Sequence, residues 1–233
     1  MTAPNTVSNQ FDINGFVLVP NAITQADLAR LTGIVEQIHS EVGADKAGVR
    51  QLLRTSPELL QYAQTTGAKL VKDVLEFEQA FPVRGILFDK SPYANWYVTW
   101  HQDRTIPIAE RRETEGFRAW STKDGTLHVQ PPVYVMESMI AIRIHLDDCT
   151  KDNGAIKFVP GSHKLGIISE EAIAGQDHTK ASVTVSASRG DVIFMRPLIL
   201  HASSKSVQPR RRRVLHIEYG TQALPDGLLW GLA

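Results

Sequence analysis

Two histidines and one aspartate have the residue types and the spacing of a metal site. His101 and Asp103 stand two positions apart in the segment Trp100–Asp103, and His201 follows one hundred residues later. Side chains two apart in a β-strand point to the same face, so His101 and Asp103 are expected to lie side by side. Two histidines and one carboxylate bind non-haem Fe(II) on one face and leave coordination positions open. The pattern predicts an iron site formed by His101, Asp103 and His201.

One arginine is spaced to bind an acidic cosubstrate beside that site. Arg212 stands eleven residues after His201, within the run Arg210–Arg213. Apolar side chains alternate from Leu215 to Tyr219, which puts Arg212 on the opposite, inward face of the same strand. A buried guanidinium needs an anionic partner, and the distal carboxylate of 2-oxoglutarate suits bidentate pairing. The other arginines of the run are expected to be solvated.

The composition excludes several classes of partner. Lys and Arg total 25 and Asp and Glu total 25, so no net charge attracts nucleic acid or an anionic membrane. Cys149 is the single cysteine, which excludes an intramolecular disulfide and a cysteine-based zinc site. The N-terminal residues resemble no secretory signal, and no uncharged apolar stretch approaches the roughly 18 residues that cross a bilayer. We expect a cytoplasmic protein that binds a small-molecule substrate; the sequence leaves its oligomeric state open.

The elements that position these residues change in character near Phe81. Before it, helical periodicity covers residues 25–39 and 57–80, preceded by one short strand at 11–20. After it, short apolar runs alternate with turn residues. The expected strands are 84–90, 96–101, 139–147, 155–159, 181–187, 191–195 and 212–219.

This order of elements predicts a mainly β fold with flanking helices, in one domain over residues 1–233. The expected core, over 81–233, is a double-stranded β-helix (jelly roll), and the helical residues 1–80 are expected to pack on one of its sheets. The connection 104–133 is long for a compact domain, and we expect it to be a lid.

Four segments, in order along the chain, carry a family pattern. They are residues 12–20 (DINGFVLVP), 100–103 (WHQD), 146–164 (LDDCTKDNGAIKFVPGSHK) and 190–203 (GDVIFMRPLILHAS), and Arg212 follows them. With these segments the chain resembles the phytanoyl-CoA dioxygenase family of Fe(II)- and 2-oxoglutarate-dependent oxygenases. The resemblance implies Fe(II) as cofactor and 2-oxoglutarate and O2 as cosubstrates.

The resemblance also implies roles for single residues. Ser203 would contact the carboxylate of 2-oxoglutarate, and Gln102 and Ile86 occupy cosubstrate-contacting positions. Arg143 replaces an aromatic cosubstrate contact of the family's best-known members, so it either contacts 2-oxoglutarate or binds an anionic group of the substrate. His163 is the rival to His201 as third ligand, although its Pro-Gly-Ser-His turn matches a structural loop of the family.

The predicted reaction is hydroxylation of an unactivated C–H bond with release of succinate and CO2. Related halogenases lack the carboxylate that Asp103 supplies, which favours hydroxylation over halogenation. Desaturation, cyclisation and epimerisation stay open, as do a non-oxidative metal enzyme and a catalytically silent binding protein on the same scaffold. Lys90, Arg104, His128 and His145 are candidate substrate contacts, and they indicate a small polar or anionic metabolite.

Overall fold

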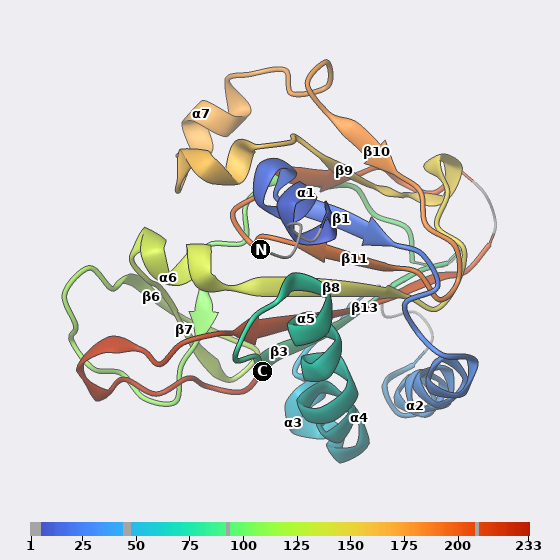
Figure 1. Ribbon diagram of the computed structural model, residues 1–233, viewed down its shortest axis with the longest axis horizontal. Helices are drawn as coiled ribbons and strands as arrows, with labels where there is room; N and C mark the ends of the chain where they lie inside the picture. Colours follow the sequence, from blue (N-terminus) through green and yellow to red (C-terminus); the bar gives the residue numbers. More distant parts are fainter. Residues whose placement is uncertain (1–5, 44–47, 92–93, 208–209) are drawn as a thin grey trace.

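The computed structural model describes residues 6–43, 48–91, 94–207 and 210–233, and its core is a pair of antiparallel sheets (Figure 1). The large sheet has the strand order β1-β11-β8-β13-β3-β2, and the small sheet has the order β10-β9-β12-β4. Two facing antiparallel sheets confirm the predicted jelly roll, and each of the seven expected strands has an observed counterpart.

The strands of both sheets are short apart from β3 and β13. Those of the large sheet are β1 (Phe16–Val19), β2 (Gly48–Val49), β3 (Phe81–Lys90), β8 (Ile140–His145), β11 (Val192–Met195) and β13 (Arg212–Gly220). Those of the small sheet are β4 (Val98–His101), β9 (Ile156–Phe158), β10 (Val183–Val185) and β12 (His201–Ser203).

Most of the helices precede the jelly roll in the chain. The α-helices are α1 (Thr6–Asn14), α2 (Gln25–Val42), α3 (Leu52–Thr55), α4 (Pro57–Tyr62), α5 (Ala68–Leu75), α6 (Val133–Ser138) and α7 (Glu170–Ala174). A π-helical turn, η1 (Ala63–Gly67), joins α4 to α5. Short 3-10 turns are η2 (Lys151–Asn153), η3 (Ser162–Leu165) and η4 (Pro225–Gly227).

The N-terminal helices cover the outer face of the large sheet, as predicted. Their apolar residues share one buried cluster with Leu215, Ile217 and Tyr219 of β13. Figure 1 shows α3, α4 and α5 gathered beside β3 and β13. The Tyr219 hydroxyl donates to the Ala63 carbonyl oxygen at 3.1 Å, which fixes β13 to the π-helical turn. Since alternate residues of β13 face this helical layer, the residues between them face the interior of the barrel.

The structure differs from the sequence-based expectation at two N-terminal elements. A helix, α1, occupies residues 6–14, where a strand was expected from Phe11 onward. Gly15 ends that helix with φ of 81°, and its amide donates to the Phe11 carbonyl oxygen at 2.7 Å. The expected helix 57–80 ends at Leu75, where Glu76 adopts the left-handed conformation.

The expected lid forms a third, small sheet. Its order is β5-β7-β6, with bounds β5 (Ile106–Pro107), β6 (Arg118–Lys123) and β7 (Thr126–Gln130). Its apolar side chains pack in their own cluster with residues of the C-terminal segment, such as Leu224 and Leu228. The segment is therefore an ordered sheet whose apolar side chains are buried in this cluster.

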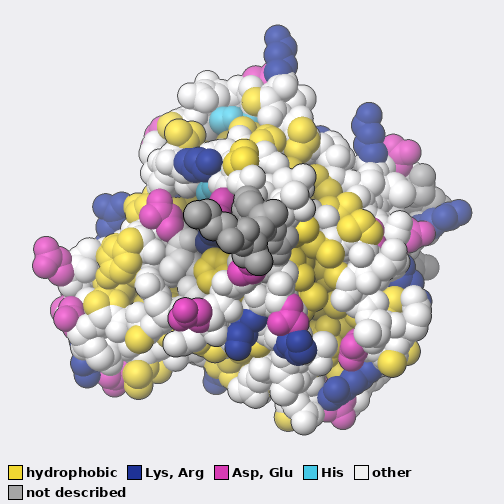
Figure 2. Space-filling view, in the orientation of Figure 1, with side chains coloured by type: hydrophobic (Ala, Val, Ile, Leu, Met, Phe, Trp, Pro, Cys, Tyr) yellow, Lys and Arg dark blue, Asp and Glu magenta, His cyan; other side chains and the backbone are white. Residues whose placement is uncertain are grey.

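The surface carries both signs of charge. On the face shown in Figure 2, Lys and Arg side chains are interspersed with Asp and Glu side chains, in keeping with the balanced composition. Within the described ranges, no helix has the length and apolar character needed to cross a bilayer.

Candidate functional site

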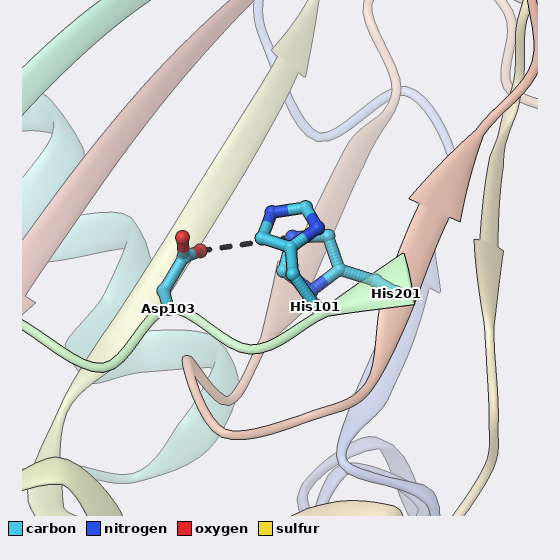
Figure 3. Close-up of side chains that lie close together, drawn as sticks. All are labelled: His101, Asp103 and His201. Atoms are coloured by element: carbon cyan, nitrogen blue, oxygen red, sulfur yellow. Dashed lines mark ion pairs between the residues drawn. The ribbon is translucent and has the colours of Figure 1, made fainter. Parts of the chain in front are cut away.

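Strand pairing brings the two predicted histidine ligands together. His101 ends β4 and His201 begins β12, and their Cα atoms are direct partners across the small sheet. The two ring centroids lie 4.1 Å apart. His201 Nε2 lies 3.7 Å from Asp103 Oδ2. One ligand atom from each of the three residues falls within 4.8 Å of the others, so this set could hold one metal ion (Figure 3).

The backbone fixes both imidazole rings in the form that binds a metal. Nδ1 of His101 lies 2.8 Å from the Thr99 carbonyl oxygen, and Nδ1 of His201 lies 2.8 Å from the Ile199 carbonyl oxygen. A carbonyl oxygen only accepts, so Nδ1 carries the proton in each ring. Each Nε2 therefore keeps its lone pair for an ion, because a metal-bound histidine usually donates its other ring N–H to a neighbouring acceptor in this way.

Asp103 lies two residues beyond the end of β4, so a loop contact places it rather than the strand. Its amide donates to the Pro197 carbonyl oxygen at 3.0 Å. Next to it, the Gln102 amide nitrogen donates to the carbonyl oxygens of Leu198 and Gly166, and its oxygen accepts from the Ile168 amide. Gln102 lines the cavity, but its amide is fully used on backbone groups.

Protonation favours a cation at this site. Burial, followed by His101, lowers the pKa of His201 to about 3, so this imidazole is neutral at physiological pH. Burial raises the pKa of Asp103, but His201, His101 and Arg84 outweigh it, and the net pKa lies well below the usual range. Two imidazoles and one carboxylate are the donor set that Fe(II) accepts.

A cavity of about 680 Å³ extends to both sides of the three residues. One end contains three cations from the inner face of the large sheet: Lys90, Arg143 and Arg212. Lys90 and Arg212 are Cα partners across β3 and β13, and all three side chains are at most 9% exposed. No described carboxylate forms an ion pair with any of them. An anion is needed there, because unpaired buried charges are costly.

The polar contacts of these cations leave room for such an anion. Lys90 Nζ donates to Ser203 Oγ at 3.1 Å, and an Arg212 Nη donates to the Gly154 carbonyl oxygen at 3.3 Å. Nε of Arg143 and Nε of Arg212 are buried and have no hydrogen-bond partner among the residues that the structure describes. Burial, followed by Arg212, lowers the pKa of Lys90 to about 7 and that of Arg143 to about 10.

The remaining predicted residues divide into two groups. Ile86, Arg104 and His128 line the cavity. Arg104 forms an ion pair with Glu170. His145 is not part of the cavity lining: its Nδ1 lies 3.3 Å from the Asp191 carbonyl oxygen, and it is 1% exposed, so the structure gives the expected substrate contact no support.

The rival third ligand lies away from the site, as expected, and one expectation about the arginine run needs correction. His163 packs beside Gly15, with Nε2 3.2 Å from the Asp12 carbonyl oxygen, and is no part of the metal-ligand set. Arg213, expected to be solvated, is buried and pairs with Asp147 through two nitrogens at 2.7 Å. These outward contacts at β13 leave Arg212 pointing inward.

The sequence reasoning did not single out a buried polar group on the other side of Asp103. Arg84 Nε donates to Glu218 Oε1 at 2.8 Å, and His216 Nε2 lies 3.2 Å from the same oxygen. The alternation that turned Arg212 inward extends to His216 and Glu218, so the signal was present. The ion pair itself could not be predicted from this alternation, because its other member, Arg84, lies on a different strand.

Comparison with known proteins identifies the family. Residues 11–214 match the family model described as phytanoyl-CoA dioxygenase (PhyH). The chain is 26% identical over 146 residues to an L-proline trans-4-hydroxylase from Streptomyces griseoviridis, covering 52% of this chain and 47% of that protein. It is 22% identical over 187 residues to phytanoyl-CoA dioxygenase 1 from Oryza sativa subsp. japonica, covering 76% of this chain and 57% of that protein. The chain thus spans about half the length of these curated relatives.

Solved structures share the fold. AviO1 from Streptomyces viridochromogenes Tue57 superimposes with a TM-score of 0.66 at 21% identity, over 97% of this chain and 98% of that one. The carbocyclase SnoK from nogalamycin biosynthesis is described as non-haem and α-ketoglutarate-dependent. It superimposes with a TM-score of 0.66 at 15% identity, over 97% of this chain and 89% of that one. With the family model covering most of the chain, the protein belongs to the phytanoyl-CoA dioxygenase family of Fe(II)- and 2-oxoglutarate-dependent oxygenases.

Proposed function

We propose that the chain is a dioxygenase that hydroxylates an unactivated C–H bond of a small polar or anionic metabolite and releases succinate and CO2. One observation carries the proposal: three convergent metal-ligand atoms lie in the same cavity as three buried cations that have no carboxylate partner among the described residues. A metal enzyme without an oxo-acid cosubstrate would not need that second feature.

In this proposal His101, Asp103 and His201 hold Fe(II). Two imidazole nitrogens and one carboxylate would hold the ion, and a donor set of this kind leaves coordination positions open for a cosubstrate. When bound, iron and 2-oxoglutarate supply the oxidising chemistry, and the residues of the chain bind, orient and enclose the reactants. The backbone contacts of both Nδ1 atoms keep the rings in their binding orientation.

Arg212 and Ser203 hold the distal carboxylate of 2-oxoglutarate, with Lys90 as a third donor. Arg143 Nη1 lies 3.4 Å from His216 Nδ1, and Asp103 is among the charges that raise its pKa, which supports a position close to the proposed metal site. We assign it to the cosubstrate rather than to the substrate. Ile86 contributes apolar contact, and Gln102 acts through the loops it ties down. Arg104 and His128 lie on the substrate side.

Anaerobic titration with Fe(II) and 2-oxoglutarate tests the proposal. Chelation of Fe(II) by the oxo-acid gives a weak visible charge-transfer band, and we expect it in the wild type. The His201→Ala variant should lose the band, because a ligand is missing. His163→Ala is the matched control and should keep it. A folded wild type that gives no band would show that the proposal is wrong.

Product analysis separates hydroxylation from the other outcomes. A metabolite screen that measures succinate release above the substrate-free rate identifies responding compounds. Mass spectrometry of the converted compound should show the gain of one oxygen atom. Loss of two hydrogens would indicate desaturation or ring closure, and an unchanged mass with altered stereochemistry would indicate epimerisation.

A further inference from the structure

We infer that the substrate is a small hydroxylated anion, which presents a hydroxyl group to Glu218 and its negative charge to Lys123. The inference rests on the proposed function and extends it to the substrate class. It is drawn from the part of the cavity around Glu218, which His216 links to Arg143, one of the three buried cations.

Glu218 has one carboxylate oxygen without a partner. Its Oε1 accepts from Arg84 and lies 3.2 Å from His216 Nε2, whereas Oε2 is buried and has no hydrogen-bond partner in the described chain. The side chain is 1% exposed and lines the cavity. Leaving a buried carboxylate oxygen unsatisfied is costly, so a donor on the bound molecule is the natural partner.

The charges around Glu218 favour a neutral donor over an ammonium group. Arg84 already pairs with this carboxylate, so the pair carries no net charge. A cationic group would face the guanidinium without compensation. The same argument disfavours a second metal ion, although Asp103, His216 and Glu218 have ligand atoms within 4.8 Å of one another. A hydroxyl group satisfies Oε2 without adding charge.

Lys123 supplies the charge at the mouth of the same region. The three arginines on this side, Arg50, Arg84 and Arg104, each form an ion pair with a carboxylate. Lys123 has no carboxylate partner within the described residues. Its Nζ donates instead to Thr105 Oγ1 at 3.0 Å.

Thr105 also places Lys123 near the buried pair. The Thr105 carbonyl oxygen accepts from an Arg84 Nη at 3.4 Å, so one residue contacts both cations. A carboxylate or phosphate on the substrate would pair with Lys123 while a hydroxyl reaches Glu218. Because Glu218 lies beside Asp103, the oxidised C–H bond would be at or next to the carbon that bears this hydroxyl.

Matched compounds separate the two contacts in the wild-type enzyme loaded with Fe(II) and 2-oxoglutarate. Gluconate carries hydroxyl groups and a charge, sorbitol carries the hydroxyl groups alone, and hexanoate carries the charge alone. Quinate, inositol and cyclohexanecarboxylate form the corresponding ring set. We expect gluconate or quinate to raise succinate release above the substrate-free rate, with kcat/KM about 10- to 100-fold above the compound lacking hydroxyl groups, as a hydrogen bond to a charged group supplies.

Variants assign these preferences to residues. Glu218→Gln should reduce the preference for hydroxylated compounds, because a neutral amide replaces the charged acceptor, while the visible band with Fe(II) and 2-oxoglutarate stays. Lys123→Met should raise KM about 2- to 5-fold for the charged compounds with little change in kcat, because an exposed ion pair contributes modest uniform binding. Lys180→Met, at an exposed lysine that does not line the cavity, is the matched control and should keep both preferences.

Each alternative outcome is decisive. Equal responses to hexanoate and gluconate would show that the substrate makes no hydrogen bond to Glu218. A preference for hydroxylated compounds that is as large in Glu218→Gln as in the wild type would show the same. A response to sorbitol equal to gluconate would remove the Lys123 contact. No response to any hydroxylated anion, with a normal visible band, overturns the inference and leaves the proposed function standing; absence of the band overturns the proposed function itself. If Glu218→Gln fails to fold, the wild-type comparison decides alone.

Discussion

At the scale of single residues, Lys90 gives the cavity a pH dependence. Burial, followed by Arg212 and also Arg143, lowers its pKa from the ordinary 10.5 to about 7, and the buried Cys149 thiol opposes this shift. An anion binds better to the protonated form. The affinity for 2-oxoglutarate should therefore be full below pH 7 and fall as the pH rises through 7, by at most about tenfold per pH unit.

Anaerobic titration of the visible band between about pH 6 and pH 8.5 measures this dependence. Lys90→Arg should bind 2-oxoglutarate with little change over that range, since an arginine stays charged. Lys90→Met should bind 2-oxoglutarate more weakly than the wild type, and its affinity should also vary little over this pH range. The same loss of affinity with pH in Lys90→Met would show that another group titrates.

Residue types and spacing predicted that His101, Asp103 and His201 converge, as the structure shows, because few patterns combine two histidines and an aspartate with an inward arginine. Alternation along a strand predicted which residues face the interior of the barrel, but not how close each of them lies to the cavity. That is why His145 was wrongly expected in the cavity although it shares a face with Arg143. The buried pair of Arg84 and Glu218 depends on the register between β3 and β13, which alternation within one strand does not reveal.

At the scale of elements, Gln102 holds the loops that carry Asp103 and His201. Gln102→Ala would leave the Leu198 and Gly166 carbonyl oxygens and the Ile168 amide without this partner. We expect a loss of about 2–4 kcal/mol in the free energy of unfolding, measured by urea denaturation. The affinity for 2-oxoglutarate should change less than in Arg212→Met, where loss of a buried charge partner costs about 30-fold or more. The reverse order would make Gln102 a direct cosubstrate contact.

The π-helical turn gives a second prediction at this scale. A Cβ atom added at Gly67 would lie 2.2 Å from Tyr219 Oη, so Gly67→Ala should destabilise the fold by about 1–3 kcal/mol. Gly33, in the exposed face of α2, has open space around it, and Gly33→Ala should stabilise by up to about 1 kcal/mol. Thermal unfolding of both variants measures the two signs. A Gly67→Ala protein as stable as the wild type would show that Tyr219 moves without penalty.

Element types were predicted well and boundaries less so. Leu28, Leu31, Val35 and Ile38 recur at helical spacing and are buried in α2, so its pattern was clear. Residues 6–14 form α1 with Phe11 as their one buried side chain, which leaves almost no periodic signal. The expected lid became a sheet because β5, β6 and β7 pack against the C-terminal segment, a contact that lies about one hundred residues away in the sequence.

At the scale of the whole molecule, the jelly roll encloses positive charge that folding alone does not neutralise. Lys90, Arg143 and Arg212 oppose folding until an anion arrives. 2-Oxoglutarate at 100 times its dissociation constant should stabilise the protein by about 2.7 kcal/mol, seen as a higher melting temperature. At the same concentration of 2-oxoglutarate, Arg212→Met, which binds about 30-fold more weakly or worse, should be stabilised by less than about 1 kcal/mol. Equal stabilisation of that variant would place the binding site elsewhere.

The general architecture was predictable because seven short strands followed a helical segment, and a jelly roll is a common solution for such a chain. The third sheet and the outward ion pairs could not be predicted from the sequence, because both depend on contacts between segments that are far apart in the chain. Arg213 shows this clearly: it lies next to an inward arginine yet pairs with Asp147 and Glu36, which belong to other elements.

The direct pairing of His101 with His201 across β4 and β12 has a consequence for handling the protein. Backbone bonds of the sheet bring the two rings together, so the ion completes a site that folding has already assembled. Chelators should strip the protein without unfolding it, in contrast to small domains whose folding energy comes from their metal. Spectroscopically informative or redox-inert divalent ions could then be exchanged into the same folded chain, and unreactive complexes could be studied in air.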